Sequence, residues 1–600
     1  MEKFLSLLLA VAVTATCFSG TTADVVLAAD GRAKAAVVLA ADATESERFA
    51  AAELSAYVGK LTGAKLPVGP AADEGLVPIT FRRLERGETA SGVKDDGYRI
   101  DVSKDGIVIA SQHPAGILFG VYHILNRFGG VEWFHAESGD DYEPIAALKV
   151  PEGTILRNPM PLRNGMPSGN GIAATPEIRR KCALWNVRNG FNLNQRNPGA
   201  DPAKVTPGND YDNRTVRELG HVDHAEAGGH VLGNLVLDTP IDPKELKAEC
   251  GRVLAEESAR FDKPQGEVVT RYAQWRILVR KHPEWFGLVD GQRVPCGVSL
   301  RDELGFHGKS SMPCLSNPGT RAAMLANFRR WRARYPKRTP VCYRICCDDQ
   351  SRWCECDACM RLLKCKGPSD DKDKASDYWW DFINWFSGEV LKDDPDLSLG
   401  VYVYRTYQTF PKKVKPVVRD RMSIVLCPHG RCYTHTLNDP KCPINGKYRD
   451  MFRVWADAGF PINAFEYMNQ TPGKCNYAFW ERVWIEDLKW YMSRGVSHGA
   501  GGLVGPWCGY AADESYFRRN AAKARWQFGW LSGKFEWDPT LDFDTVRDGM
   551  LRRYYRAAAK PMTAYHKLLE KAFLGTGICM PYGGGGSLFA AAAFFAVDLV

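Results

Sequence analysis

The stretch Val341–Cys359, VCYRICCDDQSRWCECDAC, decides how this chain is expected to fold. It begins with an apolar, β-prone run from Val341 to Ile345 and then reaches two adjacent carboxylates, Asp348 and Asp349. A (β/α)₈ barrel presents its functional groups at the C-terminal tips of buried parallel strands. The stretch therefore indicates a barrel strand that delivers acids to the barrel mouth. The alternative is a loop with capping aspartates beside a structural cysteine cluster.

The same pattern continues on both sides of that strand. Over residues 153–515, short apolar runs alternate with helical segments, which predicts an α/β fold with a parallel, TIM-like (β/α)₈ barrel. Residues 516–600 are predicted to be a helical C-terminal region, whose last 18 residues do not read as a finished domain end. Helices are also predicted over Thr175–Asn189 and Asp377–Leu391. The predicted strands are Pro161–Met166, Phe191–Gln195, Val341–Cys347, Leu397–Tyr404, Met422–Cys427, Ile462–Tyr467 and Gly502–Pro506.

Residues 30–152 have the pattern of a separate, small α/β sandwich domain. Thr44 and Glu47 form a T-x-x-E capping box, and the apolar residues that follow recur at helical spacing. A second helix is predicted from Pro114 to Phe128. The order of strands and helices predicts one sheet with both helices on the same face. The predicted strands are Ala35–Leu39, Gly97–Val102 and Gly106–Ser111.

Four segments of this domain resemble a known accessory domain. They are ESERFAAAELSAYVGKLTGAKLPV (45–68), GYRIDV (97–102), GIVIAS (106–111) and PAGILFGVYHILNRFGGVEWF (114–134). Together they are similar to the N-terminal domain of α-glucuronidases and β-hexosaminidases. In those enzymes the domain precedes a catalytic (β/α)₈ barrel. The resemblance therefore implies a carbohydrate-active neighbour and supplies no catalytic residue itself.

A second resemblance covers most of the remaining chain. Its segments are HPEWFGLVDGQRV (282–294), CLSNPGTR (314–321), DDQSRWCECDAC (348–359) and WDPTLDFDTVRDGMLRRYY (537–555). They resemble the bacterial family called domain of unknown function 4838, which commonly follows such an N-terminal domain. That family is taken to be glycosidase-like but has no agreed catalytic residues, so the chemistry must be argued from the residues of this chain.

Asp348 and Asp349 are the first candidate catalytic pair. Adjacent side chains on an extended strand point to opposite sides, so both reach the site only where the chain turns. Close carboxylates favour one protonated and one ionised group, which suits acid/base chemistry. The pair is similar to the Asp-Asp pair of family 84 hexosaminidases, although the flanking residues match no signature of those enzymes. We expect Asp349 to be the general acid and Asp348 its polarising partner; N-capping is the alternative.

Glu466 is the second candidate carboxylate. It ends the apolar run in FPINAFEYMNQ (460–470), where a barrel strand would reach the mouth. Glycosidases that do not use substrate assistance need two carboxylates, so Glu466 is expected to act with Asp349 as base, nucleophile or substrate ligand. The alternative is an ion pair between Glu466 and an arginine of the barrel rim.

Six further residues are candidate sugar contacts. They follow predicted strands or lie in loops that contain glycine or proline, where functional residues concentrate. Each of them also has a structural interpretation, as a hydrogen-bonding histidine or a core aromatic residue. The candidates are His230, Tyr404, Arg405, His429, Tyr467 and Trp507.

The cysteines are expected to be structural. Cys354, Cys356, Cys359 and Cys365 give the pattern C-x-C-x2-C-x5-C, which offers enough ligands for a tetrahedral zinc site. In an exported protein, however, disulfides are the default, so we expect disulfides in preference to zinc. The chain has 18 cysteines, and 17 remain if Cys17 is removed, so at least one thiol is free or binds a metal.

The N-terminus is typical of a signal peptide. In MEKFLSLLLAVAVTATCFSGTTADV (1–25), a lysine precedes an apolar run and then small residues. Residues 1–29 are assigned to it, with cleavage near Ala23 or Ala29, which predicts export to the periplasm or the cell exterior. Lipid anchoring at Cys17 is the weaker alternative, because the usual leucine of a lipobox is missing. No integral membrane segment is expected after cleavage.

These observations together predict an exported glycoside hydrolase. It would act on a polysaccharide or glycan by carboxylate chemistry of N-acetylhexosaminidase type and need no cofactor. The net charge of +8 has no basic block, so nucleic acid is not an expected partner. One alternative is an α-glucuronidase-like hydrolase in which Arg405 holds a sugar carboxylate. The other is a non-catalytic carbohydrate-binding protein with a degenerate barrel.

Overall fold

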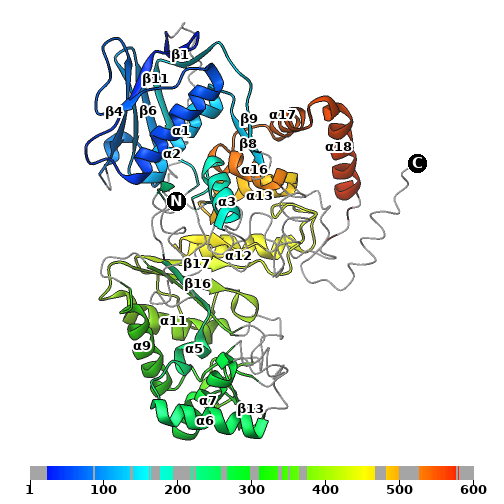
Figure 1. Cartoon of the computed structure of the whole chain (residues 1–600). Coiled ribbons are helices and arrows are strands. Elements are labelled where there is room, and N and C mark those ends of the chain that lie inside the picture. Colours follow the sequence, from blue (N-terminus) through cyan, green and yellow to red (C-terminus); the bar gives the residue numbers. More distant parts are fainter. Residues whose placement is uncertain are drawn as a thin grey trace, which may run out of the picture. The chain divides into compact units, whose positions relative to one another are not determined.

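The computed structural model describes most of the chain as two compact units, 1–132 with 142–157 and 133–141 with 158–600. Each unit has its own six-stranded sheet. Figure 1 traces the chain through both units, coloured from the N-terminus to the C-terminus. The described residues are 23–85, 88–135, 139–160, 163, 176–192, 218–220, 225–257, 266–297, 310–335, 341–348, 352–363, 375–466, 481–498, 526–575, 577 and 579.

The N-terminal unit has the predicted α/β pattern. Its sheet has the order β11-β6-β7-β5-β3-β4, and helices α1 and α2 pack against each other. The predicted capping box is present: the Glu47 N–H donates to Thr44 Oγ1 at 3.2 Å, and the Thr44 N–H donates to Glu47 Oε2 at 2.7 Å. The elements are β3 (Ala35–Val38), α1 (Glu45–Thr62), β4 (Val68–Gly69), β5 (Val77–Arg83), η1 (Thr89–Ser91), β6 (Tyr98–Ser103), β7 (Gly106–Ser111), α2 (Pro114–Arg127) and β11 (Gly153–Arg157).

A second, smaller sheet joins the two ends of this unit. β1 (Asp24–Ala29) pairs antiparallel with β10 (Ala147–Pro151) and with β2 (Arg32–Ala33). Leu27 and Ala28 of β1 are fully buried. Cleavage after Ala23 would keep this strand, whereas cleavage after Ala29 would remove it. Strand β1 thus begins six residues before the predicted boundary at residue 30.

The larger unit contains the strand that carries the acidic pair. Six parallel strands lie in the order β12-β15-β16-β17-β18-β19, so strands that follow one another in the described sequence are also neighbours in the sheet. Their bounds are β12 (Ala225–His230), β15 (Val341–Cys346), β16 (Leu397–Val403), β17 (Met422–Leu426), β18 (Ile462–Ala464) and β19 (Ser497–His498). The predicted strands at β15, β16, β17 and β18 are confirmed.

The remaining strand predictions have different outcomes. The predicted strand at Gly502–Pro506 lies outside the described residues. So do residues 193–195 of the strand predicted at Phe191–Gln195 and all of the strand predicted at Pro161–Met166 except Arg163. Phe191 and Asn192 are described and are not in a strand, which corrects the start of the predicted run. β12 and β19 were not predicted. Two short hairpins complete the strands, β8 (Glu132–His135) with β9 (Gly139–Asp141) and β13 (Leu288–Val289) with β14 (Gln292–Arg293).

Helices lie between the neighbouring strands of this sheet except between β16 and β17, where the chain has only the short 3₁₀ turn η6, and aromatic side chains are buried among these helices and strands. Trp379 and Trp380 of α11, Trp455 of α12 and Trp484 of α13 are almost completely buried, so these residues build core. The elements are α3 (Pro176–Arg188), α5 (Leu232–Leu237), α6 (Pro243–Glu257), α7 (Gly266–Lys281), η5 (Pro283–Trp285), α9 (Pro318–Arg332), α10 (Asp357–Met360), α11 (Ser376–Leu391), η6 (Arg405–Tyr407), α12 (Asn445–Asp457) and α13 (Glu481–Ser493).

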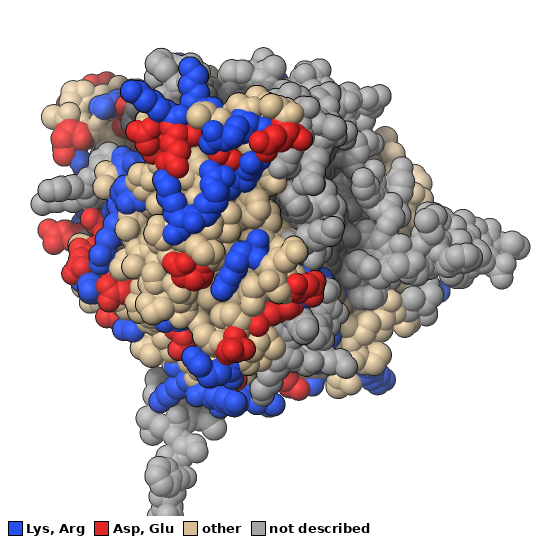
Figure 2. Space-filling model, turned by 90° about the horizontal axis from the view of Figure 1, so that it is seen from below, with Lys and Arg blue, Asp and Glu red and all other residues tan. Residues whose placement is uncertain are grey.

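The C-terminal part of the described chain is helical, as predicted. It comprises α16 (Trp526–Trp537), α17 (Phe543–Tyr555), η10 (Arg556–Ala558) and α18 (Ala559–Gly575). Arg482 of α13 bonds Asp544 of α17 and Glu570 of α18, which ties this region to the helices of the parallel sheet. Among the described residues, no helix combines the length and hydropathy that crossing a bilayer requires. On the face shown in Figure 2, basic and acidic side chains are interspersed.

A buried carboxylate joins α6 to α7. The Glu249 side chain is fully buried and is held by three arginines: Arg252 of the same helix, and Arg276 and Arg280 of α7. The hydrogen bond from Arg280 outweighs the opposing effect of burial, and Arg252 adds to it. Together they lower the pKa of Glu249 from 4.5 to about 2.

The stability of the protein is expected to depend on pH through Glu249. Its folded-state pKa lies below the unfolded value, so its contribution is complete above about pH 4.5 and is lost as the pH falls toward 2. Arg252 and Arg280 are half exposed, and solvent screening reduces the contribution to about 1–3 kcal/mol. Glu249→Gln should therefore lower the thermal midpoint of unfolding at pH 7, and the difference from wild type should shrink below pH 4.5. Glu256→Gln, at a half-exposed site, is the matched control.

Candidate active site at the strand tips

Five candidate residues follow the C-terminal tips of neighbouring parallel strands. The tips are aligned, because His230 lies opposite Cys346, Val403 opposite Leu426, and Leu426 opposite Ala464. Side chains just beyond the tips of parallel strands meet at one edge of the sheet, where ligands bind in α/β folds. The candidates at this edge are His230, Asp348, Tyr404, His429 and Glu466, with Arg405 beside Tyr404.

Asp348 is buried at the tip of β15, with only 1% of its surface exposed. Its Oδ2 accepts a hydrogen bond of 3.0 Å from the backbone N–H of Gly233, in the first turn of α5. A Cβ at position 233 would lie 2.8 Å from that oxygen and 2.4 Å from the backbone nitrogen of Gly297, so only glycine fits. The close approach of α5 thus fixes the direction of the Asp348 carboxylate.

His230 lies at the tip of β12, opposite Cys346 of β15. Its side chain is exposed, and its Nδ1 makes a short hydrogen bond with the carbonyl oxygen of Cys347. A carbonyl accepts only, so Nδ1 carries the proton of the neutral ring and Nε2 is the basic nitrogen. His230 can therefore accept a hydrogen bond through Nε2 at the sheet edge.

Tyr404, Arg405 and His429 form a half-buried group at the tips of β16 and β17. The rings of Tyr404 and His429 meet edge to face at 5.4 Å, and the guanidinium of Arg405 lies 5.8 Å from the centre of the Tyr404 ring. Arg405 has a φ of +46°, which is uncommon for a residue with a side chain. Such backbone conformations concentrate at ligand sites, and these three side chains offer both stacking and polar contacts.

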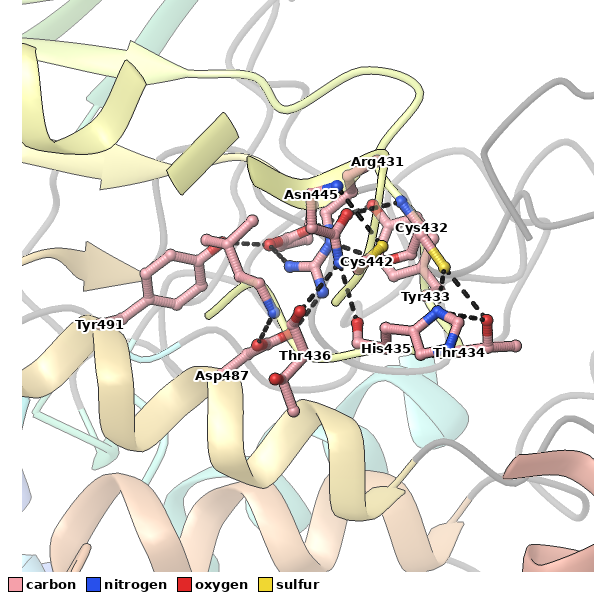
Figure 3. A network of polar contacts seen from close by, with 12 residues as sticks. Arg431, Cys432, Tyr433, Thr434, His435, Thr436, Cys442, Asn445, Asp487 and Tyr491 are labelled. Atoms are coloured by element: carbon pink, nitrogen blue, oxygen red, sulfur yellow. Dashed lines mark hydrogen bonds and ion pairs between the residues drawn. The ribbon is translucent and has the colours of Figure 1, made fainter. Parts of the chain in front are cut away.

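Glu466 lies in a buried network of charged and hydroxyl groups. Figure 3 shows Arg431, Tyr433, Asp487 and Tyr491 of this network. Its Oε1 accepts hydrogen bonds from Arg431 Nη1, at 2.8 Å, and from the Tyr491 hydroxyl. Its Oε2 accepts a hydrogen bond of 2.9 Å from the Tyr433 hydroxyl. Glu466 is completely buried and Arg431 is 1% exposed. The ion pair with an arginine, weighed from the sequence as the alternative for Glu466, is thus present.

A second carboxylate completes this network. Asp487 of α13 forms an ion pair with Arg431 and accepts a hydrogen bond of 2.5 Å from the Leu437 N–H. Burial raises the pKa of Asp487 to about 6, against the lowering effect of Arg431. For Arg431, burial acts to lower the pKa, but Asp487 and Glu466 outweigh it and raise the pKa well above the ordinary value. At neutral pH the Arg431–Asp487 pair is therefore ionised, and one guanidinium bridges two buried side chains.

The cysteines do not follow the disulfide prediction. No disulfide joins any of the 13 cysteines whose thiols the structure describes. The sulfurs of Cys354, Cys356 and Cys359 gather around Cys314, which sequence spacing did not suggest. The predicted fourth member, Cys365, lies outside the described residues, as do the candidates Asp349, Tyr467 and Trp507.

Sequence reasoning missed the residues that hold the candidates in place. Gly233 fixes Asp348, Arg431, Tyr433 and Tyr491 hold Glu466, and Asp487 pairs with Arg431. The available signal was weak: HGRCYTHT (429–436) concentrates polar and ionisable residues directly after a strand, as expected of a functional loop. Nothing in the local sequence links this loop to Asp487, which lies on a helix far along the chain.

Comparison with known sequences gives two matches. The sequence profile of the family described as "Domain of unknown function (DUF4838)" matches residues 267–567. The profile described as "Glycosyl hydrolase family 20, domain 2" matches residues 26–128, which confirms the N-terminal resemblance. No curated protein matches the sequence.

Solved structures with a similar chain include three glycoside hydrolases. A GH138 enzyme targeting pectin rhamnogalacturonan II is 11% identical with a TM-score of 0.45, over 90% of this chain and 55% of its own. A family GH115 4-O-methyl-alpha-glucuronidase with specificity for decorated arabinogalactans is 12% identical with a TM-score of 0.47, over 91% and 62%. A mutant Streptomyces plicatus beta-hexosaminidase in complex with product (GlcNAc) is 14% identical with a TM-score of 0.40, over 90% and 93%. The chain thus spans little more than half the length of the first two.

Proposed function

The chain belongs to the family described as domain of unknown function 4838, and from that premise we propose that it is a glycoside hydrolase. The observation that supports this most is the position of Asp348, a buried and oriented carboxylate at a strand tip. Tyr404, Arg405 and His429 lie half-buried at neighbouring tips. A carboxylate beside stacking and hydrogen-bonding side chains is what a sugar-cleaving site requires.

We further propose that the parallel sheet belongs to a (β/α)₈ barrel. Six parallel strands in sequential order, with helices between all neighbours except β16 and β17, support most of such a barrel. The N-terminal match to a glycosyl hydrolase family 20 domain supports the same arrangement, an accessory domain followed by a catalytic barrel. The predicted signal peptide at residues 1–29 and a glycan substrate together support export as part of this proposal.

In the proposed mechanism, Asp349 is the general acid and Asp348 its polarising partner. The Gly233 N–H holds Asp348 in place, and we assign Asp348 the ionised role, because a negative charge there would favour the protonated form of the next carboxyl group. A protonated Asp349 would donate its proton to the glycosidic oxygen as the bond to the anomeric carbon breaks. The acetamido oxygen of the substrate would bond to the anomeric carbon as the leaving group departs, and the ionised Asp348 would stabilise the positive charge on the acetamido group. Water would then attack the anomeric carbon, release the acetamido oxygen and return a proton to Asp349.

Glu466 has a supporting role in this proposal. Its two oxygens already accept three hydrogen bonds, and no part of the side chain is exposed. A nucleophile or base needs an oxygen that the substrate or a water molecule can approach. We therefore assign Glu466 to holding Arg431 and the loop that follows β17, and we assign Tyr404, Arg405, His429 and His230 to the sugar. Tyr467 and Trp507 stay proposed sugar contacts from the sequence alone.

A second candidate substrate class is a uronic-acid glycan. Arg405 supports it, because a guanidinium held at a strand tip in a constrained backbone conformation can bind a sugar carboxylate in a bidentate manner. In that case the enzyme would be α-glucuronidase-like, and Arg405→Lys would raise KM for an acidic substrate more than for a neutral one.

Hydrolysis assays distinguish these proposals. We expect the purified chain to release 4-nitrophenol from 4-nitrophenyl N-acetylglucosaminide and Asp349→Asn to abolish most of that release. Turnover of an aldouronic acid instead would support the uronic-acid substrate. Glycan binding without turnover of any glycan, unaffected by Asp349→Asn, would refute the enzyme proposal and leave a carbohydrate-binding protein.

A further inference from the structure

Four cysteine sulfurs converge beside the strand that carries the acidic pair. The sulfur atoms of Cys314, Cys354, Cys356 and Cys359 all lie within 4.8 Å of one another. Cys314 Sγ is 3.5 Å from Cys359 Sγ and 3.7 Å from Cys356 Sγ. All four thiols are free, and all but that of Cys356 are buried. Four sulfur atoms this close together, three of them buried, can coordinate one metal ion.

The spacing of these sulfurs fits a tetrahedral zinc ion. A zinc–sulfur distance of about 2.3 Å places the corners of a regular tetrahedron about 3.8 Å apart. The observed 3.5 Å and 3.7 Å are close to that edge. An iron–sulfur cluster needs its cysteines spread further apart, because inorganic sulfur and several irons lie between them. The geometry thus favours a single ion and matches zinc, the usual occupant of a four-cysteine structural site.

The surrounding chain holds the ligands without help from a metal. Ser311 and Arg352 form a parallel β-bridge, and the Met312 N–H donates to the Arg352 carbonyl at 2.8 Å, so the two cysteine-bearing segments are clamped together. The Leu288 N–H donates to Cys354 Sγ at 3.3 Å, and the Tyr378 hydroxyl lies 3.0 Å from Cys359 Sγ. Donors directed at sulfur stabilise thiolates, and such bonds commonly orient metal ligands.

We propose that Cys314, Cys354, Cys356 and Cys359 bind one structural zinc ion. Four protein ligands close the coordination shell, so the ion would have no open position for substrate or water. It would link the segment before α9 to the cysteines of residues 352–359, which follow the proposed acids in the sequence. The proposal concerns metal binding alone and does not depend on the proposed hydrolase activity.

A second cluster points independently to another zinc ion. The ligand atoms of Cys432, His435, Cys442 and Cys579 also lie within 4.8 Å of one another. Cys432 Sγ is 3.2 Å and Cys579 Sγ 3.6 Å from His435 Nδ1, while the sulfurs of Cys442 and Cys579 are 3.9 Å apart. Zinc–nitrogen and zinc–sulfur distances of about 2.0 and 2.3 Å predict a nitrogen–sulfur separation of about 3.5 Å.

The loop that carries three of these ligands is rigidly held (Figure 3). Asn445 is fully buried; its side-chain oxygen accepts from the Cys432 N–H at 2.8 Å, and its nitrogen donates to the carbonyls of Cys432, His435 and Thr436. The loop is therefore shaped independently of any ion. We infer a second structural zinc with one nitrogen and three sulfur ligands, which would join the loop after β17 to Cys579 beyond α18.

Metal analysis of the full-length protein tests both sites. After expression with zinc in the medium, we expect two zinc ions per chain by inductively coupled plasma mass spectrometry. Cys356→Ser and Cys442→Ser should each retain one, and the double variant none. Cys250→Ser, which alters a half-buried thiol outside both clusters, should retain two. Iron in place of zinc, or a Cys356→Ser variant that keeps both zinc ions, would refute the first assignment.

Thiol mapping covers the case in which a variant fails to fold. In native wild-type protein, an alkylating reagent should leave the cysteines of both clusters unmodified until a chelator is added, while their total thiol count after unfolding stays complete. Disulfide-linked peptides among Cys314, Cys354, Cys356 and Cys359 would overturn the first site. A disulfide between Cys442 and Cys579, with one zinc per chain, would overturn only the second.

Discussion

Asp349→Asn is expected to lower kcat/KM for a 4-nitrophenyl glycoside by about 10²- to 10⁴-fold, the usual contribution of a general acid. Asparagine has nearly the same shape as aspartate but has no acidic proton to donate to the leaving oxygen. The proposed role rests on the buried partner Asp348, which the Gly233 N–H holds at the tip of β15. The measurement is steady-state kinetics, with circular dichroism to show that the variant is folded.

The leaving group distinguishes a general acid from other roles. A 2,4-dinitrophenyl glycoside needs little protonation to depart, so the loss in Asp349→Asn should shrink strongly with that substrate. Asp348→Asn should instead lose a similar factor with both substrates, because its partner role does not depend on the leaving group. Asp457→Asn, at an exposed site at the end of α12, is the control and should behave as wild type. An equal loss in Asp349→Asn with both leaving groups would remove Asp349 from the role of acid.

Arg431→Met is expected to lower the free energy of unfolding by about 3–5 kcal/mol. The arginine side chain is 1% exposed and bridges Glu466 and Asp487, whose side chains are equally buried. Removing the guanidinium leaves two carboxylates without compensation in a region from which water is excluded, and that penalty exceeds the loss of the contacts themselves. Chemical unfolding followed by circular dichroism measures the change.

Two further variants show whether the uncompensated charges cause the effect. Arg453→Met removes an arginine that is 64% exposed and pairs with Asp450 at 3.7 Å, and it should change stability by less than about 1 kcal/mol. The triple variant Arg431→Met, Glu466→Gln, Asp487→Asn removes all three charges and should recover much of the stability that the single variant loses. An Arg431→Met protein with wild-type stability and no activity would instead place the network in the catalytic site.

The N-terminal unit could be predicted closely because its signals are local. The capping box at Thr44 and Glu47 starts α1, Pro114 starts α2, and both occur where the sequence indicated. The larger sheet was predicted less completely. β12 has the sequence AEAGGH and lacks an apolar run, because at Gly228 a Cβ would lie 1.8 Å from the Arg344 carbonyl oxygen. The close contact between β12 and β15 at that position requires glycine. Glycine ordinarily argues against a strand, so the sequence of β12 did not indicate one.

Of the candidate site, only the positions of the two carboxylates at the ends of strands could be predicted from the sequence. Alternating apolar residues placed Asp348 and Glu466 at the ends of strands, as found. Their environments depend on residues that are distant in sequence: Gly233 lies 115 residues from Asp348, and Arg431 lies 35 residues from Glu466. The same holds for Cys314, which joins its cluster through the bridge between Ser311 and Arg352. Spacing rules apply within one segment and cannot identify such partners.

The pairing of β1 with β10 has a consequence for the timing of synthesis. β1 begins at Asp24 and its partner strand at Ala147, so the partner is made about 120 residues later. At about 5–20 residues per second, that interval lasts roughly 6–24 s. During it, Leu27 and Ala28, which are fully buried in the finished domain, have only the two-residue strand β2 to pair with in this sheet. The first strand of the domain is therefore one of the last to find its partner strand. A nascent chain shorter than about 150 residues would expose the apolar edge of β1 to any chaperone that binds it.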